Sequence, residues 1–92
     1  MPDIRTIAIT TRHDKSDCDT CGMNYDEGGT VLVNGEEVFS YEPVASCFGN
    51  RALEEYRLLV IALRTLGIEV TVDGEVPHNC ETEAEFNARM AT

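Results

Sequence analysis

The chain has 92 residues, enough for one small domain with a single hydrophobic core. Its 17 acidic residues outnumber its 7 basic residues and give a formal net charge of −10. That excess argues against nucleic acid and anionic membranes as ligands, because both are bound through clusters of lysine and arginine. No apolar run approaches the roughly 20 residues that span a bilayer, and the first residues do not resemble a secretion signal. We therefore expect a cytoplasmic protein.

The first third of the chain divides into a strand and a polar stretch. Residues 4–11 are rich in β-branched side chains and predict a strand, with Ile7 and Ile9 facing inward. Residues 12–29 break this pattern with aspartates, glycines and two cysteines, and they predict a long polar loop. A loop of that length in a small domain is commonly functional or organised by a metal.

A hairpin is predicted over residues 30–41, where Asn34 and Gly35 separate two runs of strand-forming residues. The Asn-Gly pair readily adopts the positive φ angles of a type I′ turn. In the simplest register Val31 lies opposite Val38, and the two faces of the hairpin are then both apolar enough to meet a helix.

The longest apolar pattern predicts a helix over Asn50–Leu66, with Asn50 as its N-cap and Gly67 as the residue that ends it. Apolar residues recur at helical spacing and predict one broad buried stripe. The stripe consists of Ala52, Leu53, Tyr56, Leu59, Val60, Leu63 and Leu66. Beyond Gly67, residues 68–73 alternate apolar and polar side chains and predict a fourth strand.

A short C-terminal helix is predicted from the capping-box spacing of Thr82 and Glu85, followed by Phe86 and Met90 at i and i+4. The whole chain, residues 1–92, is then a single α+β domain. Its antiparallel four-stranded sheet follows the order β-β-β-α-β, with one long helix packed on one face and the short helix last. This size and order resemble small bacterial and phage-encoded proteins, including inhibitors and antitoxin-like modules, although no residue motif assigns an activity.

The predicted strand order brings four cysteines, far apart in sequence, to one end of the sheet. These are Cys18, Cys21, Cys47 and Cys80. Four thiolates gathered in this way could bind zinc tetrahedrally, and His13 or His78 could replace one of them. The alternative is that Cys47 and Cys80 are small buried hydrophobic residues. Redox chemistry at Cys18 and Cys21 is less favoured, because the surrounding aspartates would raise a thiol pKa.

The acidic residues of the last quarter suggest a function. Six carboxylates occur from residue 69 to residue 85 without an intervening lysine or arginine: Glu69, Asp73, Glu75, Glu81, Glu83 and Glu85. A cluster of like charges is easier to explain if a cationic partner relieves its repulsion. We therefore expect a small acidic interaction or inhibitor protein that binds a basic protein partner.

In its narrowest form this hypothesis describes a nucleic-acid mimic, whose carboxylates replace phosphates on a nucleic-acid-binding partner. The sequence contains no nucleophile elbow, phosphate-binding loop or zinc-protease motif. We accordingly expect no enzymatic activity. The alternative is a small zinc-binding or thiol-dependent protein in which the four cysteines themselves act.

Overall fold

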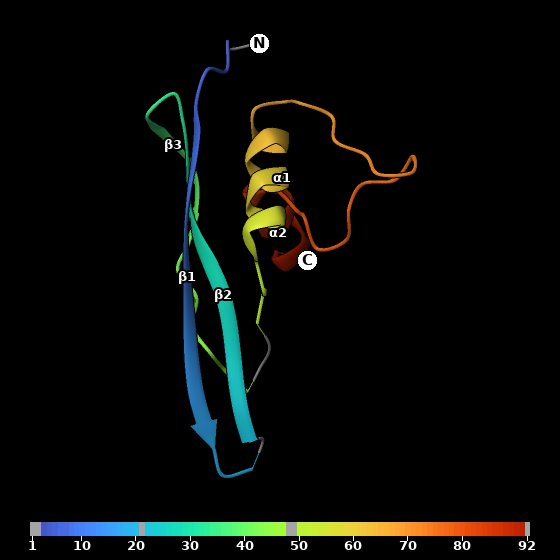
Figure 1. Cartoon of the computed structure of the whole chain (residues 1–92). Coiled ribbons are helices and arrows are strands. Elements are labelled where there is room, and N and C mark those ends of the chain that lie inside the picture. Colours follow the sequence, from blue (N-terminus) through green and yellow to red (C-terminus); the bar gives the residue numbers. More distant parts are fainter. Residues whose placement is uncertain (1–2, 21, 48–49, 92) are drawn as a thin grey trace.

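A computed structural model describes residues 3–20, 22–47 and 50–91 of the chain. A three-stranded antiparallel sheet in the order β1-β2-β3 carries the helix α1 on one face (Figure 1). The elements are β1 (Ile7–Cys18), β2 (Gly22–Val33), β3 (Glu36–Tyr41), α1 (Glu55–Thr65) and α2 (Glu83–Met90). The molecule measures 49 × 29 × 27 Å. It is elongated because β1 and β2 continue as a two-stranded ribbon beyond the first turn of α1.

The predicted polar loop over residues 12–29 is wrong, because residues 12–18 and 22–29 are the paired far parts of β1 and β2. The pairing runs without interruption from Ile7 opposite Val33 to Cys18 opposite Gly22. A strand is recognised in a sequence by alternation of apolar and polar residues. In this ribbon polar side chains occupy both faces, so the signal is absent although the backbone is extended.

The turn between β2 and β3 is confirmed, since Asn34 and Gly35 have φ angles of 53° and 83°. The register differs from the expectation by a β-bulge at Val31 and Leu32, which places Phe39 rather than Val38 opposite Val31. Because neighbouring residues of a strand point to opposite faces, the bulge moves Phe39 to the face that α1 covers. Its side chain is 5% exposed and belongs to the core.

The helix α1 begins at Glu55, so the predicted start at Asn50 is wrong. Ala52 has a φ angle of 54°, a left-handed conformation that a helix cannot contain. The next residue, Leu53, donates its backbone N–H to the carbonyl of Glu27 at 2.9 Å. The segment before α1 therefore bonds to β2 at a point that β3 does not cover, and the helix begins only after this contact.

The buried face of α1 is also rotated from the predicted stripe. Tyr56 is 48% exposed, and Leu59 and Leu63 are only half-buried. The buried residues of the helix are Leu58, Val60, Ile61 and Ala62. They pack in one cluster with Val31, Val33, Phe39, Leu53 and Cys80. Residues on two sides of α1 are buried because the sheet covers one side and the chain that returns after the helix covers another.

The end of α1 is confirmed at Gly67, whose φ angle is 86°. Its N–H donates to the carbonyl of Arg64 at 3.0 Å, and that of Ile68 donates to Leu63 at 3.0 Å. These two bonds are those of a Schellman motif.

The predicted fourth strand over residues 68–73 is wrong, and with it the four-stranded sheet and the long helix of the predicted fold. The chain instead runs along the side of α1 that faces away from the sheet (Figure 1). Val70 packs against the core from there, so its burial does not require a sheet edge. In this segment the only bridge among the described residues joins Val72 and Glu75.

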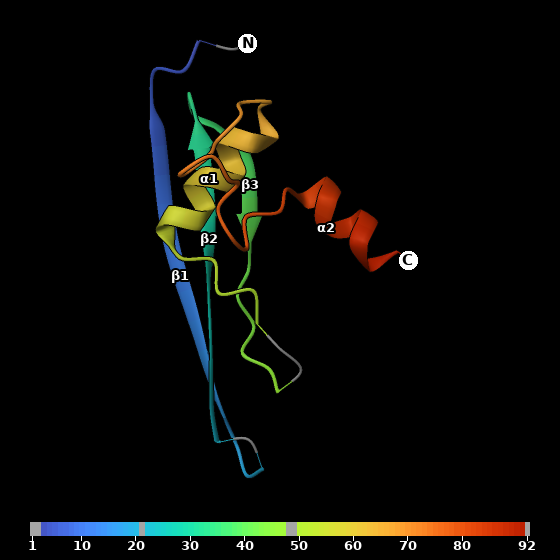
Figure 2. The same cartoon turned by 90° about the vertical axis from the view of Figure 1, so that its right-hand side faces the viewer.

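The short C-terminal helix is confirmed as α2, with Thr82 as its N-cap and a complete capping box. The backbone N–H of Glu85 donates to the Thr82 hydroxyl, and that of Thr82 donates to the Glu85 carboxylate at 2.9 Å. The helix buries no residue and projects away from the sheet (Figure 2). Over the described ranges, no helix is long and apolar enough to cross a membrane.

Candidate functional site

The structure divides the six predicted partner-binding carboxylates into two groups of three. The C-terminal glutamates Glu81, Glu83 and Glu85 all form ion pairs. Glu85 accepts both terminal nitrogens of Arg64, at 2.7 and 2.8 Å. Arg89 binds Glu81 at 2.9 Å, and Arg51 approaches Glu83 at 3.5 Å. These three carboxylates are thus already neutralised by the protein's own arginines.

The ion pairs of Glu85 and Glu81 change the pKa of these two carboxylates. The hydrogen bonds from Arg64 and the backbone N–H of Thr82 lower the pKa of Glu85 to about 2. The hydrogen bond from Arg89 lowers the pKa of Glu81. Arg51 also lies over the ring of Phe86, with its guanidinium carbon 4.2 Å from the ring centre. Together these contacts attach α2, which has no buried side chain of its own, to the rest of the domain.

The other three carboxylates, Glu69, Asp73 and Glu75, lie in what we call the acidic turn, residues 69–76. Asp73 and Gly74 have φ angles of 53° and 85°, as in a type I′ turn. Val72 and Glu75 exchange backbone hydrogen bonds of 2.8 and 3.1 Å across it. All three acidic residues are exposed, and among the described residues none of them forms an ion pair.

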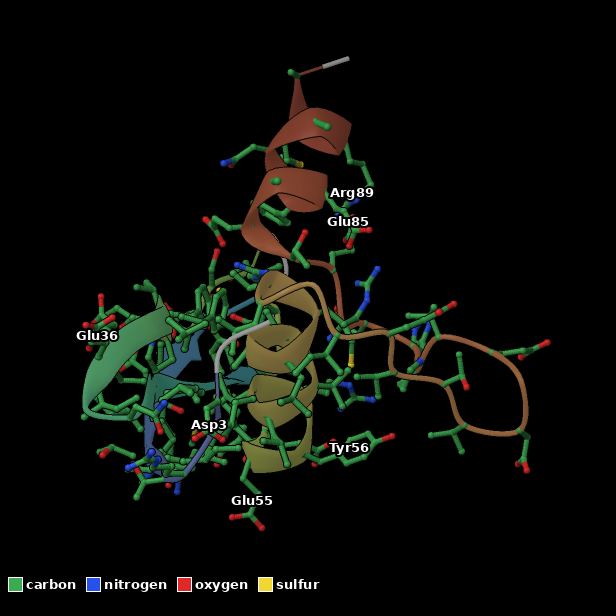
Figure 3. The ribbon with its side chains drawn as sticks, turned by 90° about the horizontal axis from the view of Figure 1, so that it is seen from above. Asp3, Glu36, Glu55, Tyr56, Glu85 and Arg89 are labelled. Carbon is green, nitrogen blue, oxygen red and sulfur yellow. The ribbon has the colours of Figure 1, made fainter. Side chains whose placement is uncertain are left out.

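The acidic turn also exposes apolar side chains. Val72 and Val76 are 51% and 50% exposed. The loop that carries them extends away from α1, and Tyr56 of α1 points to the same side of the helix (Figure 3). A surface with exposed apolar residues and carboxylates around them has the composition of a protein interface, with an apolar centre and a polar rim.

Sequence reasoning missed the residue that organises the middle of the molecule, the fully buried Asp26 of β2. One carboxylate oxygen accepts the N–H groups of Glu27 and Ala52, at 3.0 and 2.9 Å. The other accepts the Val44 N–H at 3.0 Å and the hydroxyl of Tyr41. A buried carboxylate with four donors is fully satisfied. Asp26 therefore fixes the segment between β3 and α1, and we assign it a structural role.

Burial and the neighbouring Asp26 carboxylate raise the pKa of Tyr41 to about 12, so its hydroxyl remains a donor to that carboxylate.

The two glycines that follow in β2 allow close packing beside this network. A side chain at Gly29 would meet the Thr10 carbonyl at 2.1 Å and Leu58 of α1 at 3.0 Å. The backbone of β1 therefore leaves no room for a Cβ at residue 29, so glycine is required for this pairing of β1 and β2.

A hollow of about 270 Å³, the ribbon–helix pocket, lies where the ribbon passes the start of α1. Its walls are Thr11, Arg12, His13, Tyr25, Glu27, Gly28, Leu53, Glu54 and Glu55. Tyr25 donates its hydroxyl to Glu27 at 3.2 Å and stacks on the ring of His13 with 6.0 Å between centres. The loss of hydration at the ring and the bond to Glu27 raise the pKa of Tyr25.

The pocket has a negative character, with three glutamates in its wall. The Arg12 guanidinium is turned to Glu42 and the Thr30 hydroxyl, at 2.9 and 3.0 Å. Arg57 binds Glu54, and Lys15 lies 6.0 Å above the ring of Tyr25. The arrangement suits a cationic side chain better than an anion. The sequence did not reveal it, because its residues come from a stretch that looked like a loop.

The structure does not bring the predicted thiol ligands Cys18 and Cys80 together. Cys18 pairs with Gly22 at the far end of the ribbon, whereas Cys80 is buried in the same cluster as Val31. Val31 lies nine residues from Gly22 along β2, or about 30 Å in an extended strand. Burial raises the pKa of the Cys80 thiol. The expected gathering at one end of the sheet depended on a fourth strand that does not form.

Cys47 lies beside the ribbon, where its sulfur accepts the amide of Asn24 at 3.4 Å. Cys21 lies outside the described residues. Of the candidate replacements, His13 belongs to the ribbon–helix pocket and His78 is exposed after the acidic turn. Within residues 3–20, 22–47 and 50–91, no three histidine, cysteine, aspartate or glutamate side chains are grouped as metal ligands. A zinc site formed by the four cysteines stays a prediction, which elemental analysis of the purified protein would test.

The chain was compared with protein-family models, with curated proteins and with solved structures, and none of the three comparisons gives a match. The functional argument therefore depends on the chemistry of this chain alone.

Proposed function

We propose that this chain is a small, non-enzymatic acidic protein that binds a basic protein partner through the acidic turn. The observation that carries the proposal is the exposure of Glu69, Asp73 and Glu75 on a segment that also presents Val72 and Val76. Carboxylates without a partner in their own protein are the ones that gain most from a cationic surface.

The geometry of the turn favours recognition. Its two reciprocal backbone hydrogen bonds join Val72 and Glu75 and restrict the conformations of the turn before any partner is met. Binding then loses less conformational entropy than it would with a flexible loop. The valines supply apolar area at the centre of the contact, while the carboxylates accelerate the encounter.

The C-terminal glutamates do not take part in this proposal, although the sequence suggested them. Their arginine partners would have to be displaced before a second cationic protein could bind, and α2 would lose its attachment. The ribbon–helix pocket is a second place where the same partner could insert a lysine or arginine side chain. Mimicry of nucleic-acid phosphates is the narrower form of the hypothesis, and competition between this protein and the partner's nucleic acid would test it.

The experiment is a binding titration with a fluorescent arginine-rich peptide, against an uncharged peptide of equal length. The test variant is Glu69→Gln/Asp73→Asn/Glu75→Gln, in which asparagine still favours the turn. The matched control, Asp19→Asn/Glu36→Gln/Glu37→Gln, removes three exposed carboxylates elsewhere on the chain. Because overall charge changes equally, any difference between the variants reports the location of binding.

We expect the turn variant to lose most of its affinity and the control variant to lose little. A third variant, Val72→Thr/Val76→Thr, keeps the shape and charge of the turn but reduces its apolar area. This variant should weaken the binding of a protein partner obtained by crosslinking more than it weakens the binding of the peptide. Equal losses in the turn variant and the control variant would contradict the proposal.

A further inference from the structure

Side chains on one face of the ribbon hold the segment that follows β3. Asp26 accepts the Val44 N–H at 3.0 Å. Asp14, which pairs with Asp26 across the ribbon, accepts the Ala45 N–H at 2.8 Å. Both carboxylates belong to even-numbered residues, whereas α1 packs on the face of the odd-numbered Val31. The segment after β3 therefore runs beside the ribbon on the face that α1 does not cover (Figure 2).

Cys47 continues this row of contacts toward the tip of the ribbon. Its sulfur accepts the side-chain amide of Asn24 at 3.4 Å. Asn24 pairs with Ser16, and Cys18, two residues further along β1, forms the last pair of the sheet with Gly22. Since side chains alternate between the two faces of a strand, Cys18 points to the same face as the pair of Ser16 and Asn24. The structure thus places two thiols that are distant in sequence on one face near the tip.

The two thiols lie about one step of the strand apart. Side chains two residues apart in a strand are separated by about 7 Å, and a disulfide requires Cβ atoms about 4 Å apart. Asn50 keeps the exposed Cys47 beside the ribbon, because its side chain accepts the Ser46 N–H at 3.0 Å and donates to the Ser46 carbonyl at 3.3 Å. A movement of about 3 Å then brings the two cysteines into bonding distance.

We propose that Cys18 and Cys47 form a reversible disulfide when the protein meets a small-molecule disulfide as oxidant. The thiolate of Cys47 attacks one sulfur of the oxidant, forms a mixed disulfide and releases one small thiol. The thiolate of Cys18 then attacks the Cys47 sulfur and displaces the second small thiol. The oxidant accepts two electrons and the protons of both cysteines, and an excess of a reducing thiol reverses the exchange.

The disulfide joins the segment after β3 to the tip of the ribbon. Pairing between β2 and β3 ends at Gly29 and Tyr41, so β3 does not support the ribbon from there to its tip. The bond closes a ring of the chain from residue 18 to residue 47, which reduces the conformational entropy of the unfolded chain. Oxidation therefore stabilises this end of the molecule. The acidic turn takes no part in the bond, so the proposal does not depend on the function assigned to that turn.

Oxidation of the folded protein by cystamine tests the proposal. Cystamine is a cationic disulfide, so the negative charge of the chain does not repel it. After the remaining thiols are alkylated, peptide mass spectrometry should identify a bond between Cys18 and Cys47. Cys80, which is buried, should be alkylated only after denaturation. A main product that joins Cys21 to either of the two cysteines, or that carries only cystamine adducts, would overturn the proposal.

Two variants and a denatured control locate the bond. Cys21→Ser keeps both proposed partners and should oxidise like the wild type, whereas Cys47→Ser should lose the product. In urea the wild type should instead join mainly Cys18 to Cys21, because closure of the shorter loop costs less entropy. The same products in urea and in native buffer would show that the folded ribbon does not direct the reaction, which contradicts the proposal.

Thermal unfolding measures the consequence of the bond. The oxidised wild type should melt about 5 °C or more above the reduced protein, and dithiothreitol should abolish the difference. Cys47→Ser, treated with cystamine in the same way, serves as the matched control and should show little change. An unchanged or lower melting temperature in the crosslinked wild type would mean that the native ribbon does not hold the two cysteines together, and it would overturn the proposal.

Discussion

The acidic turn and the C-terminal glutamates each contain three carboxylates, and only a few residues separate them in sequence. In the structure the two groups of carboxylates have opposite surroundings. Every C-terminal glutamate is bound to an arginine, and Glu85 also caps α2. The carboxylates of the acidic turn are exposed on a turn that is held by its own backbone.

This difference shows that a run of acidic residues does not define a binding surface by itself. The basic partners of the C-terminal glutamates are Arg51, Arg64 and Arg89, two of which precede the acidic run and one of which follows it. Charge counted along the chain hides such pairs. When the ion pairs of the folded structure are taken into account, the acidic turn is the group whose charge repulsion a second protein could relieve.

The largest loss of stability should come from Arg64→Met, which removes the arginine partner of a C-terminal glutamate. Arg64 binds Glu85 with two nitrogens and also donates to the carbonyl of Cys80 at 2.7 Å. Loss of these bonds should lower the free energy of unfolding by about 2 kcal/mol, measured by urea denaturation. The control Arg5→Met breaks the exposed pair with Asp3 and should change little. Equal effects of the two substitutions would mean that Arg64 does not stabilise the attachment of α2.

A smaller loss is expected for Glu85→Gln, which weakens both the ion pair and the capping box. Glu85 is about half exposed, so solvent screening limits the contribution of the pair. We expect the variant to be less stable by about 1 kcal/mol and its helix content by circular dichroism to fall. Glu75→Gln, the same substitution in the acidic turn, should leave both quantities unchanged. If Glu75→Gln were also destabilised, the two groups of carboxylates would not differ in their contribution to folding.

Lowering the pH should also destabilise the folded protein, because it protonates the C-terminal glutamates. The pKa of Glu85 is about 2 in the folded protein against 4.5 for an unperturbed glutamate. Because the folded value is the lower one, the stabilisation is complete above pH 4.5 and is lost as the pH falls toward 2. The carboxylate signals of a labelled sample, followed by NMR, should show this low midpoint in the wild type. In Arg64→Met the midpoint should return toward 4.5.

The smallest effect on stability is expected for Glu69→Gln/Asp73→Asn/Glu75→Gln. These side chains are exposed and unpaired within the described structure, so the free energy of unfolding should stay within about 0.5 kcal/mol of the wild type. Thermal and urea denaturation both measure it. A large loss would show that the acidic turn, like the C-terminal glutamates, serves folding.

Local signals predicted several parts of the fold correctly. The Asn34-Gly35 turn, the glycine that ends α1 and the capping box of α2 each depend on a few neighbouring residues. The errors arose where distant contacts decide. Ala52 adopts a left-handed conformation beside the Asp26 network, which a local helix pattern cannot reveal. The extended ribbon was missed because its side chains are polar on both faces.

Half of the proposed surface could be predicted from the sequence. Glu69, Asp73 and Glu75 were identified from charge, but the exposure of Val72 was not, since residues 68–73 were predicted to be a half-buried strand. Val76 lies beyond that predicted strand, and its exposure was not predicted either. The ribbon–helix pocket was missed entirely, because β1, β2 and the start of α1 meet there only in the folded chain. A bulge of one residue likewise decided which face of β3 carries Phe39.

The association rate of the partner with the wild type and with Glu69→Gln/Asp73→Asn/Glu75→Gln, measured by stopped flow at several salt concentrations, tests the central claim most directly. We predict that the variant associates about tenfold more slowly at low salt and that the two rates converge as salt screens the carboxylates. Equal rates for the wild type and the variant at every salt concentration would contradict docking through the acidic turn.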